Sequence, residues 1–87
     1  MKTINAKNAP QAIGPYSQAK IVENLVFTSG QIPLKVDGTI VCDDFEKECI
    51  QVLDNLKEIL EHSGSSMLNI IKLTVYLTDL SNFNILF

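Results

Sequence analysis

The sequence of 87 residues contains no arginine and no tryptophan, and its seven basic residues are all lysines that do not cluster. Together with a net charge of −3, this composition argues against a nucleic-acid partner, because nucleic-acid-binding surfaces concentrate positive charge. The only histidine and the two cysteines, Cys42 and Cys49, stand at unrelated spacings. They therefore give no metal-site pattern.

Long hydrophobic runs are also lacking. The N-terminus has no apolar core of the kind a secretory signal needs, and no apolar run reaches the length of a membrane span. We therefore expect a cytoplasmic protein with reduced thiols and no membrane partner. The apolar fraction of 46% is typical of a globular protein, and the length allows one domain, residues 1–87. So short a chain buries a small core, for which oligomerisation is a usual remedy.

Short strand-like runs separated by turns fill the N-terminal half of the sequence. We expect a short edge strand at residues 2–6 and two further strands at residues 19–22 and 25–28. The two residues between the latter, Glu23-Asn24, suit a tight hairpin. A second two-residue hairpin turn is predicted at Asp37-Gly38.

Residues 43–63 are predicted to form the longest helix. Asp43 can accept hydrogen bonds from first-turn amides, and Glu46 three residues later completes a pattern like a capping box. Gly64 is placed to end the helix in a left-handed conformation. The apolar residues recur at three- and four-residue spacing and form one stripe: Phe45, Cys49, Val52, Leu53, Leu56, Ile59 and Leu60.

The last third of the sequence is predicted to contain a strand at residues 70–78. Its apolar residues alternate with polar ones, so one face is expected to pack on the helix stripe and the other to suit a subunit interface. A helical turn at residues 67–69 precedes this strand, and Ser81 is a fair N-cap for a second helix. The order of elements indicates an α+β layout with the long helix on one face of a sheet.

The strand-like run at residues 25–28 ends in Ser29-Gly30-Gln31, where a hydroxyl and backbone and side-chain amides come together. A polar corner at the end of a rigid strand is a common way to present binding groups, although a serine–glycine pair is also an ordinary turn. Tyr16 follows the stiff Gly14-Pro15 pair. Its ring suits core packing, and its hydroxyl suits a pocket.

Three other residues have both a structural and a chemical reading. Cys49 lies on the apolar stripe and is expected to be a buried small hydrophobe. Cys42 precedes the helix, where the helix dipole can lower the pKa of a thiol, but no histidine is near it in sequence. His62 lies in the last predicted helical turn, where a favourable dipole interaction explains it better than catalysis does.

Several segments, taken together and in this order, resemble the RidA (YjgF) family. They span most of the chain: Asn8-Ala9-Pro10, Ile13-Gly14-Pro15-Tyr16-Ser17-Gln18-Ala19, Thr28-Ser29-Gly30-Gln31-Ile32-Pro33, Leu53-Asp54-Asn55-Leu56-Lys57, and residues 72–80 with Phe83. The resemblance implies a chorismate-mutase-like α+β fold with a long helix packed on one face of the sheet. It also implies a homotrimer with sites in the clefts between subunits.

The resemblance further implies hydrolysis of reactive enamines and imines, such as 2-aminoacrylate, 2-iminopropanoate and 2-iminobutanoate, to 2-oxo acids and ammonia. Members need no metal and no organic cofactor. Tyr16 matches the family's pocket tyrosine, Ser29 matches the serine at the strand end, and Gly30 matches the glycine beside the cleft. The resemblance therefore assigns these three residues to substrate binding.

Other parts of the family's site have no match in this sequence. An arginine that binds the substrate carboxylate and a glutamate that orients the attacking water lie in the family's C-terminal third. This chain ends before either and contains no arginine. The family's pocket asparagine would fall at Phe87, and Asn84 is out of register. The catalytic residues thus stay unassigned, and we expect a domain that lacks its last helix and strands.

Besides an imine deaminase with impaired activity, the sequence allows two further hypotheses. One is a non-catalytic trimeric module that keeps a cleft for a small ligand. The other is a degenerate fragment, because missing strands would leave a sheet edge and part of the helix stripe uncovered.

Overall fold

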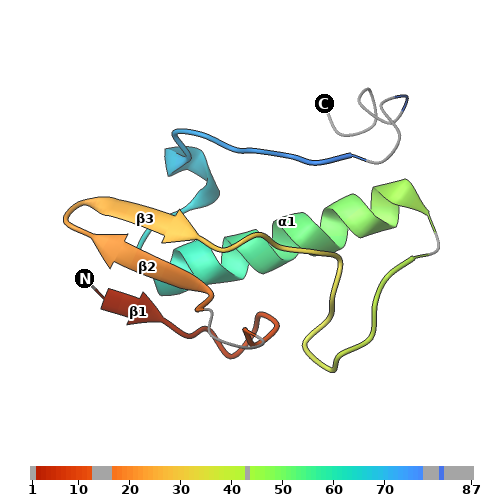
Figure 1. The fold of residues 1–87 in the computed structure, drawn as a ribbon, viewed down its shortest axis with the longest axis horizontal. Helices are drawn as coiled ribbons and strands as arrows, with labels where there is room; N and C mark the ends of the chain where they lie inside the picture. The colour runs from red at the N-terminus through yellow and green to blue at the C-terminus, as the bar shows by residue number, and fades with distance from the viewer. Residues whose placement is uncertain (1, 13–16, 43, 78–80, 82–87) are drawn as a thin grey trace.

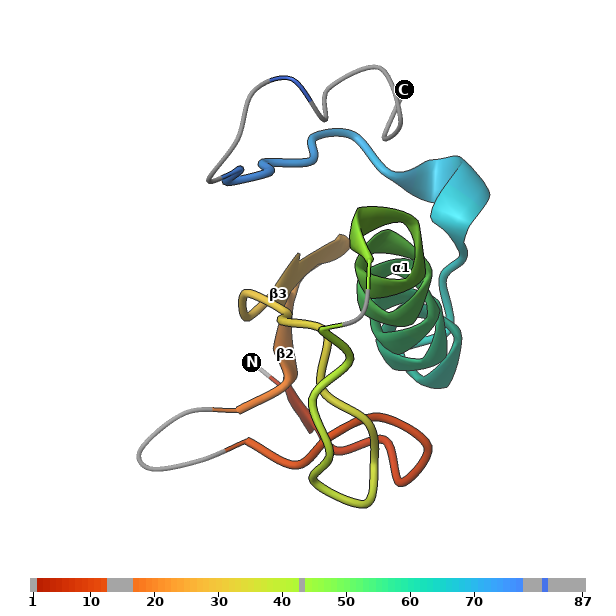
Figure 2. The ribbon, with the colours of Figure 1, turned by 90° about the vertical axis from the view of Figure 1, so that its right-hand side faces the viewer.

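A computed structural model describes residues 2–12, 17–42, 44–77 and 81. Three short strands precede one long helix: β1 (Lys2–Ile4), β2 (Ala19–Val22), β3 (Leu25–Thr28) and α1 (Phe45–His62). A 3₁₀ turn, η1 (Met67–Asn69), follows the helix. The strands form one antiparallel sheet in the order β1-β2-β3, and α1 runs across one face of this sheet (Figures 1 and 2). The α+β arrangement predicted from the sequence is confirmed.

The β2–β3 hairpin has the bounds expected from the sequence, and Val22 pairs with Leu25 across the two-residue loop. Glu23, the first loop residue, has a φ of 55°. This region favours glycine, because the side chain of an L-residue crowds its own backbone there. β1 is shorter than predicted, since its pairing with β2 ends at Ile4.

The core lies between the sheet and the C-terminal half of α1. Its buried residues come from β1, the loop after it, β2 and the helix, and Ile21 and Val26 pack against them: Ile4, Ala6, Ala9, Ala19 and Ile59. The predicted apolar stripe is buried at Leu56, Ile59 and Leu60, whereas its members in the first helical turns are half-buried. Burial of this stripe determines which face of the helix packs against the sheet.

The start of α1 corrects the sequence-based assignment of the cap. The N-cap is Asp44, whose Oδ1 accepts a hydrogen bond from the Lys47 N–H at 2.9 Å. The prediction that Asp43 caps the helix with Glu46 was therefore wrong by one residue. The C-terminal signal is confirmed, because Gly64 has a φ of 84° just after the helix.

Residues 34–41 form a looser hairpin than predicted. Leu34 and Ile40 make a single antiparallel bridge. Lys35 N–H donates to the Thr39 carbonyl at 2.8 Å, and Gly38 N–H donates to the Lys35 carbonyl at 3.0 Å. The loop therefore holds three residues, with Gly38 at a φ of 92°, which is the other common hairpin geometry. The prediction of a two-residue turn at Asp37-Gly38 was therefore wrong by one residue.

The strand predicted at residues 70–78 is not formed in its described part. Residues 72–77 have no regular secondary structure, and Tyr76 is 93% exposed. A strand exists only through hydrogen bonds to a neighbour, and no described strand lies beside this segment. The helical turn expected just before it is confirmed as η1. A second helix was expected to begin at Ser81, and the residues after Ser81 lie outside the described part of the chain.

Candidate substrate-binding site

Ser29 follows β3 directly and is fixed to the residues that precede β2. Its Oγ donates a hydrogen bond to the Ser17 carbonyl, and its N–H donates to the Gln18 carbonyl at 2.9 Å. The hydroxyl hydrogen is thus already used, while the oxygen keeps lone-pair capacity to accept a hydrogen bond. Since Ser29 is only half-buried, that acceptor is available to a small molecule at the end of the strand.

Gly30 stands next to it and is exposed. A Cβ atom added at Gly30 would meet no atom within 4 Å, and its φ lies outside the left-handed region. The described part of the chain therefore gives no steric reason for glycine here. No hydrogen bond within the described chain uses the Gly30 N–H, so this backbone donor is open beside the Ser29 oxygen.

Tyr16, the third residue that the sequence assigned to the site, lies outside the described residues. The nearest described neighbour in sequence, Ser17, is bonded to Ser29. The structure thus brings Ser17, Ser29 and Gly30 to one corner, and the choice between packing and pocket for Tyr16 stays open.

The Gln18 side chain connects this corner to the backbone of residues 6–10. The side chain is 2% exposed, and its Oε1 accepts a hydrogen bond from Ala6 N–H. Its Nε2 lies 3.0 Å from the Ala6 carbonyl, 3.4 Å from that of Ala9 and 2.7 Å from that of Pro10. One buried amide thereby satisfies the backbone of the loop that precedes residues 13–16, which would otherwise be buried without partners.

Asn55 performs the same task on the other side of Ser29-Gly30. Its side chain is also 2% exposed, and Nδ2 donates to the Ile32 carbonyl at 3.2 Å and to the Leu34 carbonyl at 2.9 Å. Oδ1 accepts from Gln51 Nε2 at 2.9 Å. The segment that leaves the site is therefore fastened to the middle of α1.

Sequence reasoning missed both of these tethers as functional positions. Asn55 carried a signal, because it is a polar residue three positions after Val52 and four before Ile59, within the apolar stripe. A polar residue at such a position needs buried partners. Gln18 carried no signal of this kind, since nothing near it in sequence says which carbonyl groups the folded chain brings around it.

Outside this corner, the two cysteines and the histidine are the other candidates for chemistry in the described part of the chain. Burial, with help from the negative charges of Glu48 and Glu46, raises the pKa of the Cys49 thiol, which fits the prediction of an unreactive position. Cys42 is exposed, as is His62. No three histidine, cysteine, aspartate or glutamate side chains gather into a possible metal site among the described residues.

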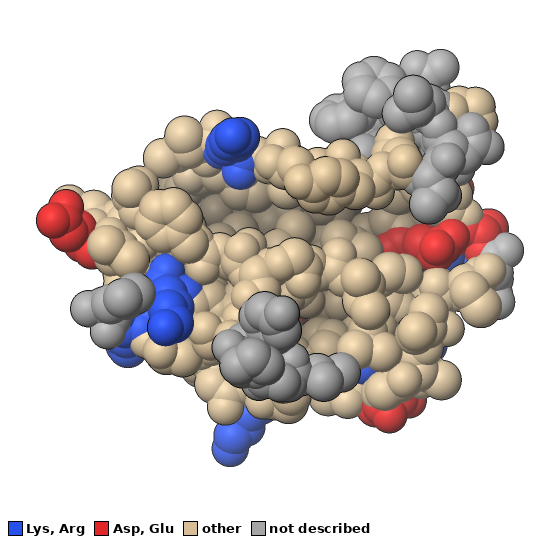
Figure 3. Space-filling model, viewed as in Figure 1, with Lys and Arg blue, Asp and Glu red and all other residues tan. Residues whose placement is uncertain are grey.

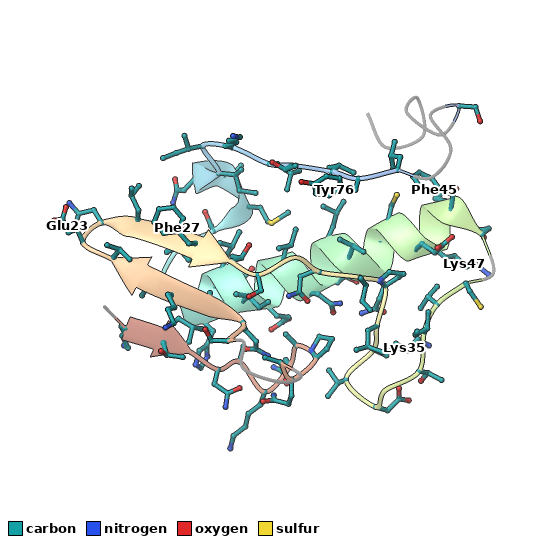
Figure 4. The ribbon with its side chains drawn as sticks, viewed as in Figure 1. Glu23, Phe27, Lys35, Phe45, Lys47 and Tyr76 are labelled. Carbon is teal, nitrogen blue, oxygen red and sulfur yellow. The ribbon has the colours of Figure 1, made fainter. Side chains whose placement is uncertain are left out.

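A cavity of about 390 Å³ lies between residues 35–41 and the first turns of α1. Lys35 and Lys47 line it (Figure 4), with Gln51 and four residues of small or aliphatic side chain. It contains neither Ser29 nor Gly30.

None of the described helices has the length and apolarity required to cross a membrane.

Comparison with known proteins shows which sequences and structures this chain resembles. The 2-iminobutanoate/2-iminopropanoate deaminase of Escherichia coli is 44% identical over 82 residues, which are 94% of this chain and 64% of that protein. RidA from an Antarctic Psychrobacter matches the structure with a TM-score of 0.92 at 40% identity, over 99% of this chain and 70% of that one. Escherichia coli TdcF, solved with bound serine, gives a TM-score of 0.92 at 41% identity, over 99% and 68%.

The chain spans about 65% of the length of the curated relatives it matches first. Residues 6–86 match the family described as endoribonuclease L-PSP. This match covers nearly the whole chain and includes the three residues that the resemblance to RidA assigned to the site. The chain therefore belongs to the endoribonuclease L-PSP family, which includes the RidA proteins.

Proposed function

We propose that the chain binds a small 2-imino or 2-enamino acid at the Ser29-Gly30 corner and contributes to its hydrolytic deamination. The observation that carries the proposal is the hydrogen-bonded state of Ser29, whose hydroxyl donates to Ser17 and so presents an acceptor. Beside it, the backbone N–H of the exposed residue Gly30 presents a donor. The similarity to a named imine deaminase supports this chemistry.

The reaction needs positioned groups more than it needs an unusual nucleophile. Water adds its oxygen to C2 of 2-iminopropanoate, the C2–N bond then breaks, and ammonia leaves with the transferred protons while the 2-oxo acid remains. The Ser29 oxygen would accept from the imine N–H, and the Gly30 N–H would donate to an oxygen of the ligand. Such positioning lowers the barrier by holding reactants in productive geometry. The family resemblance assigns Tyr16 to the same substrate-binding site.

The sequence has no arginine to bind the substrate carboxylate bidentately. We therefore propose that the chain by itself has weak activity or none. The discriminating assay generates 2-aminoacrylate with a pyridoxal-phosphate-dependent dehydratase and follows ammonia release with and without the chain. We expect a rate far below that of the Escherichia coli deaminase. An equal rate would contradict the assignment of the missing groups.

Binding can be tested separately with serine, the ligand of the similar TdcF. We expect amide shifts at Ser29 and Gly30 in a nuclear magnetic resonance titration, and weaker binding in Ser29→Ala and Gly30→Ala. Ser65→Ala is the matched control, because Ser65 is half-buried but makes no side-chain hydrogen bond among the described residues. Shifts confined to other parts of the chain would reject the site.

Binding without turnover would instead favour a second function, a non-catalytic ligand-binding module. The lack of arginine is the observation that supports it. The same lack, with the net charge of −3, argues against RNA as the substrate despite the family's description. We place either activity in the cytoplasm.

We also propose that the protein forms a homotrimer through the outer face of its sheet. Val22, Leu25 and Phe27 are 39%, 47% and 59% exposed there, and pairing of Val22 with Leu25 puts them together. Exposed apolar patches of this kind mark interaction surfaces. Analytical ultracentrifugation should give three times the chain mass, and Phe27→Glu should reduce it. A monomer at all concentrations would contradict the proposal.

A further inference from the structure

The cavity between residues 35–41 and the first turns of α1 has no part in the proposed function. Its volume of about 390 Å³ lies at the lower end of the range for small-molecule sites in proteins. The hairpin of residues 34–41 forms one wall and α1 forms the other. Figure 1 shows this hairpin, in yellow and yellow-green, beside the end at which α1 begins.

Hydrogen bonds hold both walls in place without a ligand. Val41 N–H donates to the Pro33 carbonyl at 2.8 Å and so closes the hairpin. Gln51, which lines the cavity, donates from Nε2 to Asn55 Oδ1 at 2.9 Å. Asn55 Nδ2 in turn donates to the Leu34 carbonyl at 2.9 Å and joins the helix to the hairpin. A cavity with walls fixed in this way binds a ligand at a reduced entropic cost.

Both charged side chains that line the cavity are cationic. Lys35 comes from the hairpin and Lys47 from the first turn of α1 (Figure 4), and no described carboxylate lines the cavity. Neither ammonium group forms an ion pair with a carboxylate of the described residues. After the hydrogen bonds from Thr39, the Lys35 charge helps to lower the pKa of Asp37, but Asp37 lies outside the lining. Positive charge on both walls favours an anionic ligand.

The rest of the lining is largely apolar and only partly covered. Ile40 and Ile50 are 57% and 53% exposed although both line the cavity, and Val41 is half-buried. In the space-filling view the surface over the hairpin is mostly uncharged, with an acidic patch near its tip (Figure 3). Aliphatic carbon atoms of a ligand would remove this apolar surface from water, whereas inorganic phosphate would not.

We propose that this cavity, called here the two-lysine cavity, binds a small aliphatic dicarboxylate. One carboxylate would lie at Lys35, the other at Lys47, and the carbon chain between them against Ile40 and Ile50. The Gln51 amide keeps a second N–H that can donate to a carboxylate oxygen. The two-lysine cavity is separate from the Ser29-Gly30 corner, so its ligand does not depend on the proposed function.

The test is a nuclear magnetic resonance titration of the full chain with pentanedioate, with pentanoate and with inorganic phosphate. Pentanoate has the same carbon chain as pentanedioate but only one carboxylate. We expect pentanedioate to shift the methyl signals of Ile40 and Ile50 and to bind about threefold more tightly than pentanoate, as one further exposed ion pair predicts. Sodium chloride should reduce this preference by screening. Phosphate should leave the two methyl signals unchanged.

Two results of this titration would overturn the proposal. Equal affinities for pentanedioate and pentanoate would show that the second lysine does not contact the ligand. Shifts confined to Ser29 and Gly30 would place the dicarboxylate at that corner instead.

Charge-removing variants then test the two lysines. Lys35→Met and Lys47→Met keep an unbranched side chain, and each should abolish the preference for pentanedioate over pentanoate. Lys57→Met should retain it, because Lys57 is an exposed lysine of the same helix that does not line the cavity. Ile50→Ala should weaken both ligands alike, since it removes apolar contact but no charge. If Lys35→Met and Lys47→Met also weaken both ligands by the same factor, their role is structural and the proposal is wrong.

Discussion

Replacing Asn55 by aspartate tests whether the segment after Ser29-Gly30 is held by the amide of this residue. The change keeps the side-chain shape but removes both hydrogen bonds that Nδ2 donates to Ile32 and Leu34. The Ile32 carbonyl keeps a bond from Leu34 N–H at 2.7 Å. The Leu34 carbonyl keeps no partner within the described chain.

The magnitude follows from these losses. The Leu34 carbonyl is partly buried, and a carbonyl left there without a partner costs up to about 1–3 kcal/mol. The introduced carboxylate would in addition face two carbonyl oxygens at a site where the present side chain is 2% exposed. At pH 7 it must either stay charged there or take up a proton, and each unit by which its pKa rises costs about 1.4 kcal/mol. We expect a total destabilisation of about 3–5 kcal/mol, a large share of a small domain's stability.

The pH dependence has a definite sign. Burial and the carbonyl oxygens raise the pKa of the introduced carboxyl above its unfolded value of about 3.9. Its protonated form can donate one hydrogen bond, so the stability it contributes is present below the unfolded pKa and is lost as pH rises through the folded pKa. The deficit of the variant should therefore be smallest near pH 4 and largest at neutral pH.

These losses can be measured by urea unfolding at several pH values. The proteins to compare are the wild type, Asn55→Asp, Asn55→Ala and Asn69→Asp. Asn69 is exposed, so its variant controls for the added charge and should lie within about 0.5 kcal/mol of the wild type. Asn55→Ala should lose about 2 kcal/mol at every pH, because it adds no charge. If Asn55→Asp and Asn55→Ala both lie within about 0.5 kcal/mol of the wild type at pH 7, the tether is not the source of stability.

Three further changes test other parts of the fold. Glu23→Gly should raise the free energy of unfolding by about 0.5–1 kcal/mol, because the φ of 55° then carries no steric cost; a loss in urea unfolding would contradict this. Gln18→Glu should lower it by about 2–4 kcal/mol by setting an acceptor against three carbonyl groups, whereas the exposed Gln11→Glu should change little. The hydrogen bonds that Thr39 donates lower the pKa of Asp37, so Thr39→Val should raise that pKa in a nuclear magnetic resonance titration. Stability linked to Asp37 is present above its unfolded pKa and is lost as pH falls, and this loss should diminish in the variant.

Elements with strong local signals could be predicted from the sequence. The β2–β3 hairpin needed only two β-prone runs at a two-residue spacing, and α1 needed only its apolar periodicity and Gly64. The cap was assigned one residue too early, because Asp43 and Asp44 are adjacent and either carboxylate could cap the helix. The structure selects Asp44, whose carbonyl accepts the first helical bond, from Glu48 N–H at 3.1 Å.

What depends on a distant neighbour could not be predicted in the same way. The alternation in residues 70–78 is real, but whether such a segment is a strand depends on an edge beside it, and β3 does not reach it. Gln18 and Asn55 likewise act on carbonyl groups between 8 and 23 positions away. Ser29 and Gly30 were assigned through a family resemblance, and the hydrogen bond from Ser29 to Ser17 appears only once the hairpin is folded.

The hydrogen bonds of Gln18 and Asn55 order the Ser29-Gly30 corner before any ligand binds. Gln18 fixes the backbone before β2, to which Ser29 is bonded, and Asn55 fixes the backbone just beyond Gly30. Because both ends are held without a ligand, binding there need not include the entropic cost of ordering the segment. Glycine at position 30 meets no steric demand from the described chain, so Gly30→Ala should leave the free energy of unfolding within about 0.5 kcal/mol of the wild type. A loss of serine binding in that stable variant would mean that the space beside Gly30 serves the ligand.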